Sequence, residues 1–283
     1  MSARTTAEGA PDVTSGRKNR DIRRSEAVVS GGVQHGPMAR RTARTTGTTG
    51  RTGAAGAAGG RGTTTVRGAR RPELRLPPLT PYEDDDGLEP DGDYDALDFR
   101  EADLTGQDGA GARFMDCALT GCALDEASLR AARLLDTRLT GVRGVGTNLA
   151  EATLRDVELL DARLGGTQLH GAVLERVLIR GGKIDYLNLR RARLKDVVFE
   201  SCVLVEPDFG GARLERVEFV DCALKQADLS AATLTDVDLR GATPLELSRG
   251  VDRLSGAVIS PAQLLDLAPV LAAELGVRVV GDG

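Results

Sequence analysis

Large apolar residues recur at every fifth position from Phe99 to Leu239, and this period decides the fold class. Of the 29 positions in that frame, 27 are Leu, Ile or Phe, and the exceptions are Gly109 and Gly144. A second inward position lies two residues before each large one, and 25 of these 29 are Ala, Val, Cys, Thr or Gly. None of the positions in either set is charged, as a dry interior requires. A period of five fits neither a helix nor a strand, but it is typical of a solenoid whose repeats stack.

A longer period of twenty residues predicts how the chain coils. The small position is Ala at every twentieth residue from Ala112 to Ala232, and Val at every twentieth residue from Val157 to Val237. Residues twenty apart therefore share an environment, so four fives make one turn with four walls and a corner after each. At twenty residues a turn, residues 96–243 are predicted to make about seven coils, stacked at roughly 4.8 Å.

The repeat unit resembles that of the pentapeptide-repeat family, often written A-(D/N)-L-x-x. It stands here as Ala102-Asp103-Leu104 and Ala227-Asp228-Leu229, and more loosely as Ala212-Arg213-Leu214. The resemblance implies an all-β solenoid, a right-handed quadrilateral β-helix. Some members of that family bind type II topoisomerases as mimics of duplex DNA and protect against quinolones, and many others have no assigned activity.

The residues before the repeats divide into a tail and a linker. Residues 1–70 are rich in Arg, Thr, Gly and Ala without an apolar period, which predicts a disordered basic tail. Such a tail is either a weak, nonspecific contact for nucleic acid or a solvated segment without function. Residues 71–95 form a proline-rich and then acidic linker, whose Leu74, Leu76 and Leu79 are candidates to lie along the solenoid.

The residues after the repeats predict a cap. Pro244 ends the frame, and the open end of a solenoid needs cover against edge pairing. Within the cap, 244–283, Ser260, Pro261 and Gln263 are typical of a helix start, which predicts a C-terminal helix near 261–275. Apolar surface left on this cap would join two copies end to end as a homodimer.

With the interior filled, any function falls to the outward positions, and three surface features stand out there. The first is a column at twenty-residue spacing whose amino-terminal part is Asp116, Asp136 and Asp156, either an acidic binding face or solvated corner residues. The second is an apolar patch that meets either a partner or the chain's own proline-rich segment. The third is the outward aromatic Tyr186, which we expect beside that patch. The patch residues are Leu178, Val198, Val203, Val205 and Val220.

The sequence offers no constellation for catalysis. It carries no Ser-His-Asp set, phosphate-binding loop or zinc spacing, so we expect no enzyme activity, no cofactor and no metal. The four cysteines, Cys117, Cys122, Cys202 and Cys222, all occupy small inward positions. They are either buried thiols or, for Cys202 and Cys222 one turn apart, a redox pair.

Composition indicates the compartment and limits the partners. No apolar run is long enough for a membrane span and the amino end shows no apolar signal core, so we expect a cytoplasmic protein. Residues 96–243 hold 24 acids and 19 bases, a net charge of −5, which is sparse for a mimic of duplex DNA. The sequence therefore favours a scaffold for an unknown protein partner, with a DNA-mimic modulator of DNA gyrase or topoisomerase as the alternative.

Overall fold

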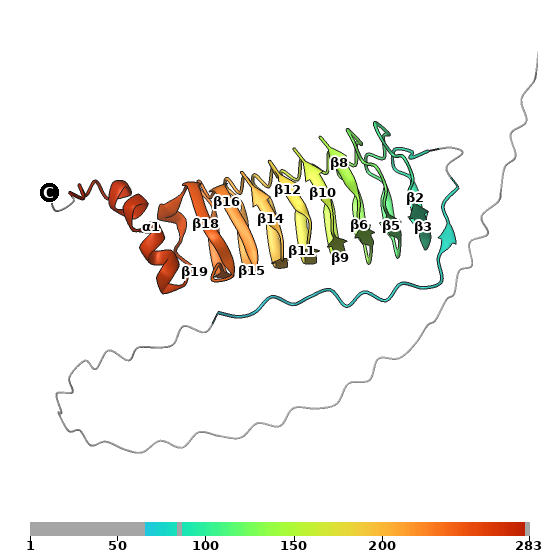
Figure 1. Cartoon of the computed structure of the whole chain (residues 1–283). Helices are drawn as coiled ribbons and strands as arrows, with labels where there is room; N and C mark the ends of the chain where they lie inside the picture. Colours follow the sequence, from blue (N-terminus) through green and yellow to red (C-terminus); the bar gives the residue numbers. More distant parts are fainter. Residues whose placement is uncertain (1–65, 84–86, 281–283) are drawn as a thin grey trace, which may run out of the picture. The chain divides into compact units, whose positions relative to one another are not determined.

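The computed structural model describes residues 66–83 and 87–280, which include a parallel β-solenoid of about nine turns followed by one α-helix (Figure 1). The strands form two sheets, a main sheet of 13 strands and a second sheet of six. The main sheet contains β1 (Thr80–Pro81), β2 (Asp93–Asp95), β3 (Leu97–Arg100), β4 (Arg113–Met115), β5 (Ala118–Thr120), β6 (Arg133–Leu135), β7 (Arg138–Thr140), β9 (Thr153–Leu160), β11 (Val173–Arg180), β13 (Arg193–Glu200), β15 (Arg213–Val220), β17 (Thr233–Asp238) and β19 (Ala257–Val258). The second sheet contains β8 (Arg143–Val145), β10 (Arg163–Gly165), β12 (Lys183–Asp185), β14 (Val203–Val205), β16 (Cys222–Asp228) and β18 (Ala242–Arg249). A 3₁₀ turn (Val251–Arg253) and helix α1 (Pro261–Glu274) complete the chain.

Strand register confirms the period of twenty. In the ladder between β9 and β11, Leu154 pairs with Leu174, and in the next ladder Leu174 pairs with Leu194. The small inward residues Ala152 and Ala172 are fully buried, as the two-position pattern predicts. Every turn of the solenoid therefore repeats the same packing, and the apolar interior runs through the stack.

The solenoid has more turns than the expected seven because the coil continues beyond both ends of the apolar frame. One path through the main sheet joins ten strands from β1 to β19, each bonded to the next. At the amino end, β2 pairs with β4 and places Tyr94 in the interior, although this strand falls in the range assigned to the linker. At the carboxyl end, β18 and β19 pair with β16 and β17, within the range assigned to the cap.

Each corner of the coil adopts the same backbone conformation. Every fifth residue from Asp91 to Asp236 has a positive φ, and most of these residues are not glycine. The left-handed region is unfavourable for a residue with a Cβ atom. The period of five therefore describes the corners as well as the interior, and corner side chains twenty residues apart stand in one column.

The two glycines in the large inward frame have different consequences. A Cβ atom on Gly109 would approach Leu88, whose side chain is buried there and fills the space that a large residue would have taken. At Gly144 a Cβ atom would lie 2.7 Å from Thr147 Oγ1 and 2.9 Å from the backbone of Leu124. The backbone itself has moved into that position, so a larger residue has no room.

Helix α1 begins as the sequence predicts. Ser260 is the N-cap in a capping box with Gln263, and Pro261 follows it at the first helical position. The Nε2 of Gln263 donates to the carbonyls of Leu239 and Ala242, at 2.7 and 2.6 Å, and so ties the helix to the last complete turn. None of the helices in the described part of the chain is long and apolar enough to cross a membrane.

Candidate interaction surface

The corner between the two walls of the main sheet carries a column of charged side chains. We call it the corner column: Asp116, Asp136, Asp156, Arg176, Asp196, Arg216 and Asp236. All seven have φ between 48° and 58°, so their side chains leave the backbone in the same way. Consecutive members stand one turn apart, at roughly the 4.8 Å spacing of neighbouring strands.

The carboxyl part of the corner column, where aspartate and arginine alternate, forms ion pairs between turns. Arg176 donates from Nε and Nη2 to the two carboxylate oxygens of Asp156, both at 2.6 Å. Arg216 binds Asp196 in the same way, at 2.7 and 3.0 Å. Two-point contact between a guanidinium and a carboxylate is stronger than a single exposed pair.

In the described part of the chain, the amino part of the corner column is paired only at its last member. We call Asp116, Asp136 and Asp156 the acidic column; of the three, only Asp156 has an arginine bonded to it among the ion pairs of the described residues. Local desolvation raises the pKa of Asp136, and the neighbouring carboxylates of Asp156 and Asp116 raise it further. The structure therefore brings the three predicted acids together, and the charge of Asp136 is disfavoured by the other two.

Asp196 belongs to the corner column, yet its side chain is fully buried. A second guanidinium, that of Arg70, donates to Asp196 Oδ2 at 2.7 and 3.1 Å, and the Arg70 amide donates to Oδ1 at 3.2 Å. Burial alone would raise the pKa of Asp196, but the hydrogen bonds from Arg216 and Arg70 lower it well below its usual range. The carboxylate stays charged between two arginines.

Arg70 belongs to a segment that crosses the main sheet, residues 66–79, which we call the arginine segment. Arg67 binds Asp236 at 2.9 Å, the Ala69 amide donates to Glu218 Oε1 at 2.7 Å, and Arg71 binds Glu200 at 2.5 Å. Its residues thus meet strand β17, then β15, then β13, and Thr80 joins strand β3 in a backbone ladder. The arginine segment runs along the stack of turns, across the strands.

The apolar patch predicted from sequence is divided by the structure. Leu178 and Val198 pair in neighbouring strands of the main sheet and are 6% and 0% exposed, although both point outward. The arginine segment bonds on both sides of Val198, at Asp196 and Glu200, so it covers this part. Half-buried Val220 ends β15 of the same sheet, whereas Val203 and Val205, also half-buried, lie in β14 of the second sheet.

Tyr186 remains available on the surface. Its side chain is 58% exposed, and its amide donates to the Val205 carbonyl at 2.8 Å, which places it one turn from β14. It therefore lies beside the Val203 and Val205 part of the predicted patch, on a corner with φ of 55°.

Sequence reasoning missed the residues that hold the arginine segment. Residues 66–70 fall in the range assigned to the disordered tail, and the rest of that range, 1–65, lies outside the described residues together with the proposed nucleic-acid contact. One signal was present. Pro72, Leu74 and Leu76 alternate with polar residues, and in the structure Pro72 is buried and the two leucines are half-buried. Alternation of this kind indicates an extended segment with one face against a surface.

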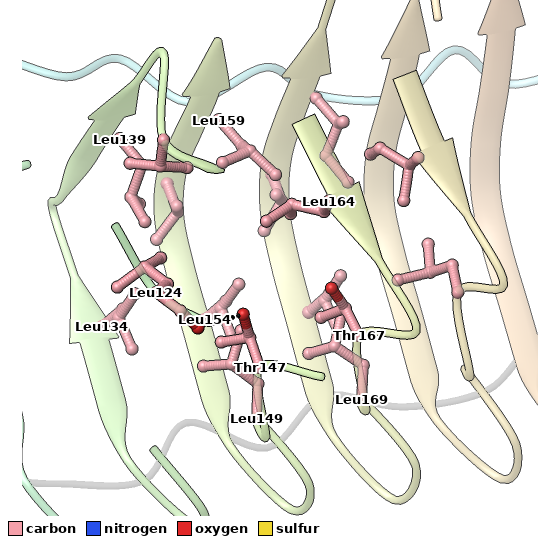
Figure 2. Close-up of a pocket in the computed structure, with 17 residues that line it drawn as sticks. Leu124, Leu134, Leu139, Thr147, Leu149, Leu154, Leu159, Leu164, Thr167 and Leu169 are labelled. Atoms are coloured by element: carbon pink, nitrogen blue, oxygen red, sulfur yellow. Dashed lines mark hydrogen bonds between the residues drawn. The ribbon is translucent and has the colours of Figure 1, made fainter. Parts of the chain in front are cut away.

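A narrow cavity of about 40 Å³ lies in the interior, lined mainly by apolar side chains of four successive turns (Figure 2). Two hydroxyls face it. Thr147 Oγ1 donates to the Leu124 carbonyl at 2.7 Å, whereas Thr167 Oγ1 has no hydrogen-bond partner among the described residues. A space of this size and polarity offers no site for substrate chemistry.

The cysteines are all buried and free. The Cys202 amide lies 3.5 Å from the Cys222 sulfur, so the two thiols stack one turn apart as predicted, without a disulfide. The pKa of the Cys202 thiol is raised because Cys222 and burial both oppose its ionisation. Over residues 66–83 and 87–280, no group of three or more His, Cys, Asp or Glu side chains is arranged to hold a metal ion.

Comparisons with known proteins agree with the repeat pattern. A family model described as "Pentapeptide repeat region" matches residues 112–189, and one described as "Pentapeptide repeats (8 copies)" matches residues 208–243. A comparison with curated protein sequences finds no match.

Two solved proteins are similar to this chain at low identity. HetL, a pentapeptide repeat protein involved in heterocyst differentiation regulation from the cyanobacterium Nostoc sp. strain PCC 7120, is 21% identical with a TM-score of 0.28, over 62% of this chain and 92% of that one. Trypsin-treated QnrB1, a plasmid-mediated fluoroquinolone resistance protein, is 21% identical with a TM-score of 0.26, over 70% and 95% of the two chains.

Proposed function

We propose that this chain, which is a pentapeptide-repeat protein, acts as a non-enzymatic scaffold that binds a protein partner through its charged corner. The acidic column carries the proposal. Its three carboxylates stand in register one turn apart, and the raised pKa of Asp136 means that the charge of this middle carboxylate is disfavoured in the free protein. A partner that brings positive charge to this corner would relieve the repulsion, so charge complementarity favours its binding.

The proposed partner surface extends over rigid structure. Each carboxylate of the acidic column leaves a corner held by backbone hydrogen bonds to the next turn, such as Asp116 N–H to the Leu135 carbonyl at 3.1 Å and Asp136 N–H to the Arg155 carbonyl at 3.0 Å. Preorganised charges lose little freedom on binding, which increases the affinity that they contribute. The proposal also places the protein in the cytoplasm, where its four free thiols are in keeping with a reducing environment.

Affinity capture with a matched charge control tests the scaffold. The full-length protein carrying Asp116→Asn, Asp136→Asn and Asp156→Asn should lose partners that the unmodified protein retains in its native host. A control with Glu101→Gln, Glu126→Gln and Glu206→Gln removes as many exposed charges from corners with the same positive φ and should keep them. If both variants retain the same partners, the acidic column is not the binding surface.

The alternative function is a DNA-mimic modulator of DNA gyrase or topoisomerase. The acidic column favours it, because negative charges repeat along the stack as phosphates repeat along a duplex. The run of negative charge that resembles a duplex is short, because Arg176 and Arg216 neutralise the corner column from Asp156 onward. Purified protein at saturating concentration would change gyrase supercoiling or quinolone-trapped cleavage if this alternative holds, and unchanged activity in both assays removes it.

A further inference from the structure

The arginine segment is held differently from the strand that follows it. Thr80 and Tyr82 donate backbone hydrogen bonds to the carbonyls of Ala96 and Asp98, at 2.9 and 3.0 Å, so β1 is part of the solenoid. Over residues 66–79, by contrast, every hydrogen bond to the solenoid involves a carboxylate side chain. The arginine segment is therefore seated on the surface and is not built into a backbone ladder.

The surface beneath it has the chemistry of a peptide-binding face. We call it the acid-rimmed face: Leu178 in β11 and Val198 in β13, with Asp196 and Glu200 on either side of Val198 and with Glu218 and Asp236 in the next two turns. The two apolar residues are among the most buried outward positions, and each of the four carboxylates accepts a hydrogen bond from the arginine segment. Apolar residues bordered by charged ones are how protein interfaces combine affinity with specificity.

The arginine segment is bound weakly enough for another peptide to displace it. The side chains of Arg67, Arg70 and Arg71 are 74%, 61% and 47% exposed, so their ion pairs compete with water and salt. Asp196 also has a two-point contact with Arg216, so release of the arginine segment leaves that carboxylate with a partner of its own. The acid-rimmed face can lose this occupant without losing its own charge network.

We propose that the acid-rimmed face is a binding surface for an extended arginine-rich segment of a partner protein, and that the arginine segment occupies it in the free protein. This inference rests on the proposed function and names the partner's chemistry: paired arginines followed by a proline and alternate apolar residues. Residues 70–76, Arg-Arg-Pro-Glu-Leu-Arg-Leu, are the example of that chemistry that the structure places on the face.

Tethering explains how the arginine segment covers the acid-rimmed face until a partner binds. The arginine segment is joined directly to β1, so it competes with any separate peptide at an effective concentration on the order of millimolar. A partner segment must exceed that competition by higher affinity or by a second contact, such as one on the acidic column. Removing arginines of the arginine segment should therefore allow a peptide supplied in solution to bind the acid-rimmed face.

The test uses the full-length protein and a labelled synthetic peptide of residues 66–79. Fluorescence anisotropy should show the peptide binding at least about tenfold more tightly to the Arg70→Ser, Arg71→Ser variant than to the unmodified protein, because the variant has lost its own competitor. Circular dichroism and the melting temperature verify that the variant is folded. Equal binding to both proteins overturns the proposal.

A charge exchange locates the bound peptide. Adding Glu200→Arg to the variant should weaken binding of the 66–79 peptide, and a peptide with Arg71→Glu should restore it, since Arg71 and Glu200 pair directly. If the peptide with Arg71→Glu fails to bind, the acid-rimmed face is not the peptide-binding surface. Tight binding of a labelled unmodified chain to the variant would identify a second copy as the occupant and would likewise overturn the assignment to a partner. The acidic column is unchanged throughout, so these results stand apart from the test of the scaffold.

Discussion

At the scale of single residues, Asp196 shows how a buried charge is made compatible with a surface column. Its carboxylate is fully buried yet bonded by two guanidiniums, one from the next turn and one from the arginine segment. Breaking such a pair from one side is costly, because the remaining charge is left without its partner.

Replacing Asp196 with Asn should destabilise the protein, and the effect should depend on pH. At pH 7 we expect the free energy of unfolding to fall by about 2–4 kcal/mol, measured by urea denaturation. The folded pKa of Asp196 is depressed below 3.8, so its contribution is present above that pH and is lost as the pH falls through the folded value. Asp161→Asn, at an exposed corner, is the control and should change little. A difference that persists unchanged in strong acid would contradict this account.

Two threonines in the lumen provide a matched pair for the cost of an unpaired hydroxyl. Thr167 Oγ1 is buried without a hydrogen-bond partner among the described residues, whereas Thr147 Oγ1 bonds to the Leu124 carbonyl. Thr167→Val should therefore raise the free energy of unfolding by about 1 kcal/mol, while Thr147→Val should not. The comparison is by chemical denaturation, and equal effects at both positions would show that the Thr167 hydroxyl is satisfied in solution.

At the scale of elements, the corner is the unit that repeats. Ala131 occupies a corner with φ of 57° and its side chain is exposed, so its Cβ atom contributes strain without packing. Ala131→Gly should raise the free energy of unfolding by about 0.5–1 kcal/mol, because relief of the left-handed strain exceeds the added entropy of the unfolded chain. Ala118→Gly, within strand β5, is the control and should lower it. Thermal denaturation of the two variants measures both changes in the free energy of unfolding. Destabilisation by both substitutions would mean that the corners carry no strain.

Helix α1 is attached to the solenoid through the polar side chain of Gln263 as well as through the apolar side chain of Leu267. The buried Gln263 closes the capping box with Ser260 and donates to the carbonyls of Leu239 and Ala242. Gln263→Ala should cost about 1–3 kcal/mol and release the helix first, because the buried Ala242 carbonyl loses its Gln263 donor and the Leu239 carbonyl keeps only the Ala242 amide. Hydrogen exchange should show faster exchange in Pro261–Glu274 than in β13 and β15. Ala262→Ser at an exposed position of the same turn serves as the control, and unchanged protection of the helix in Gln263→Ala would contradict the assignment.

At the scale of the whole molecule, the carboxyl end exposes apolar side chains that the solenoid does not cover. Leu265 and Leu275 are 75% and 78% exposed, and Val279 is 77% exposed, close to one another along the chain. Exposed apolar surface of this kind often marks an interface. Leu267 lies on the inner face of helix α1 and is buried against the last turn. The outer face of the helix therefore remains available to a second copy.

We therefore expect a homodimer through the C-terminal cap. Light scattering of the full-length protein at micromolar concentration should give twice the monomer mass, and Leu265→Asp with Leu275→Asp should return it to the monomer. Val145→Asp is the control, because Val145 is 65% exposed on strand β8 of the second sheet, away from the cap. A monomer mass for the unmodified protein removes the prediction.

The order of the residues by itself determined the coil. The inward frame from Phe99 to Leu239 and the period of twenty predicted which side chains are buried and which strands stack, because a solenoid repeats one local packing rule at every turn. The helix start at Ser260 was predictable for the same reason, since a capping box is complete within four residues.

Only the tertiary structure decided what covers the outside. Arg70 and Asp196 are 126 residues apart, and neither lies in a pattern that announces the other. Burial of Leu178 and Val198 likewise depends on where an extended segment is laid, and extended segments have no internal hydrogen bonds to fix their course. The extra turn at the amino end also escaped the apolar frame, because Leu88, which lies outside that frame in the sequence, fills the space beside Gly109. Contacts within one repeat are local and can be predicted from sequence, whereas contacts between the repeats and the rest of the chain are set by the surface that the completed coil presents.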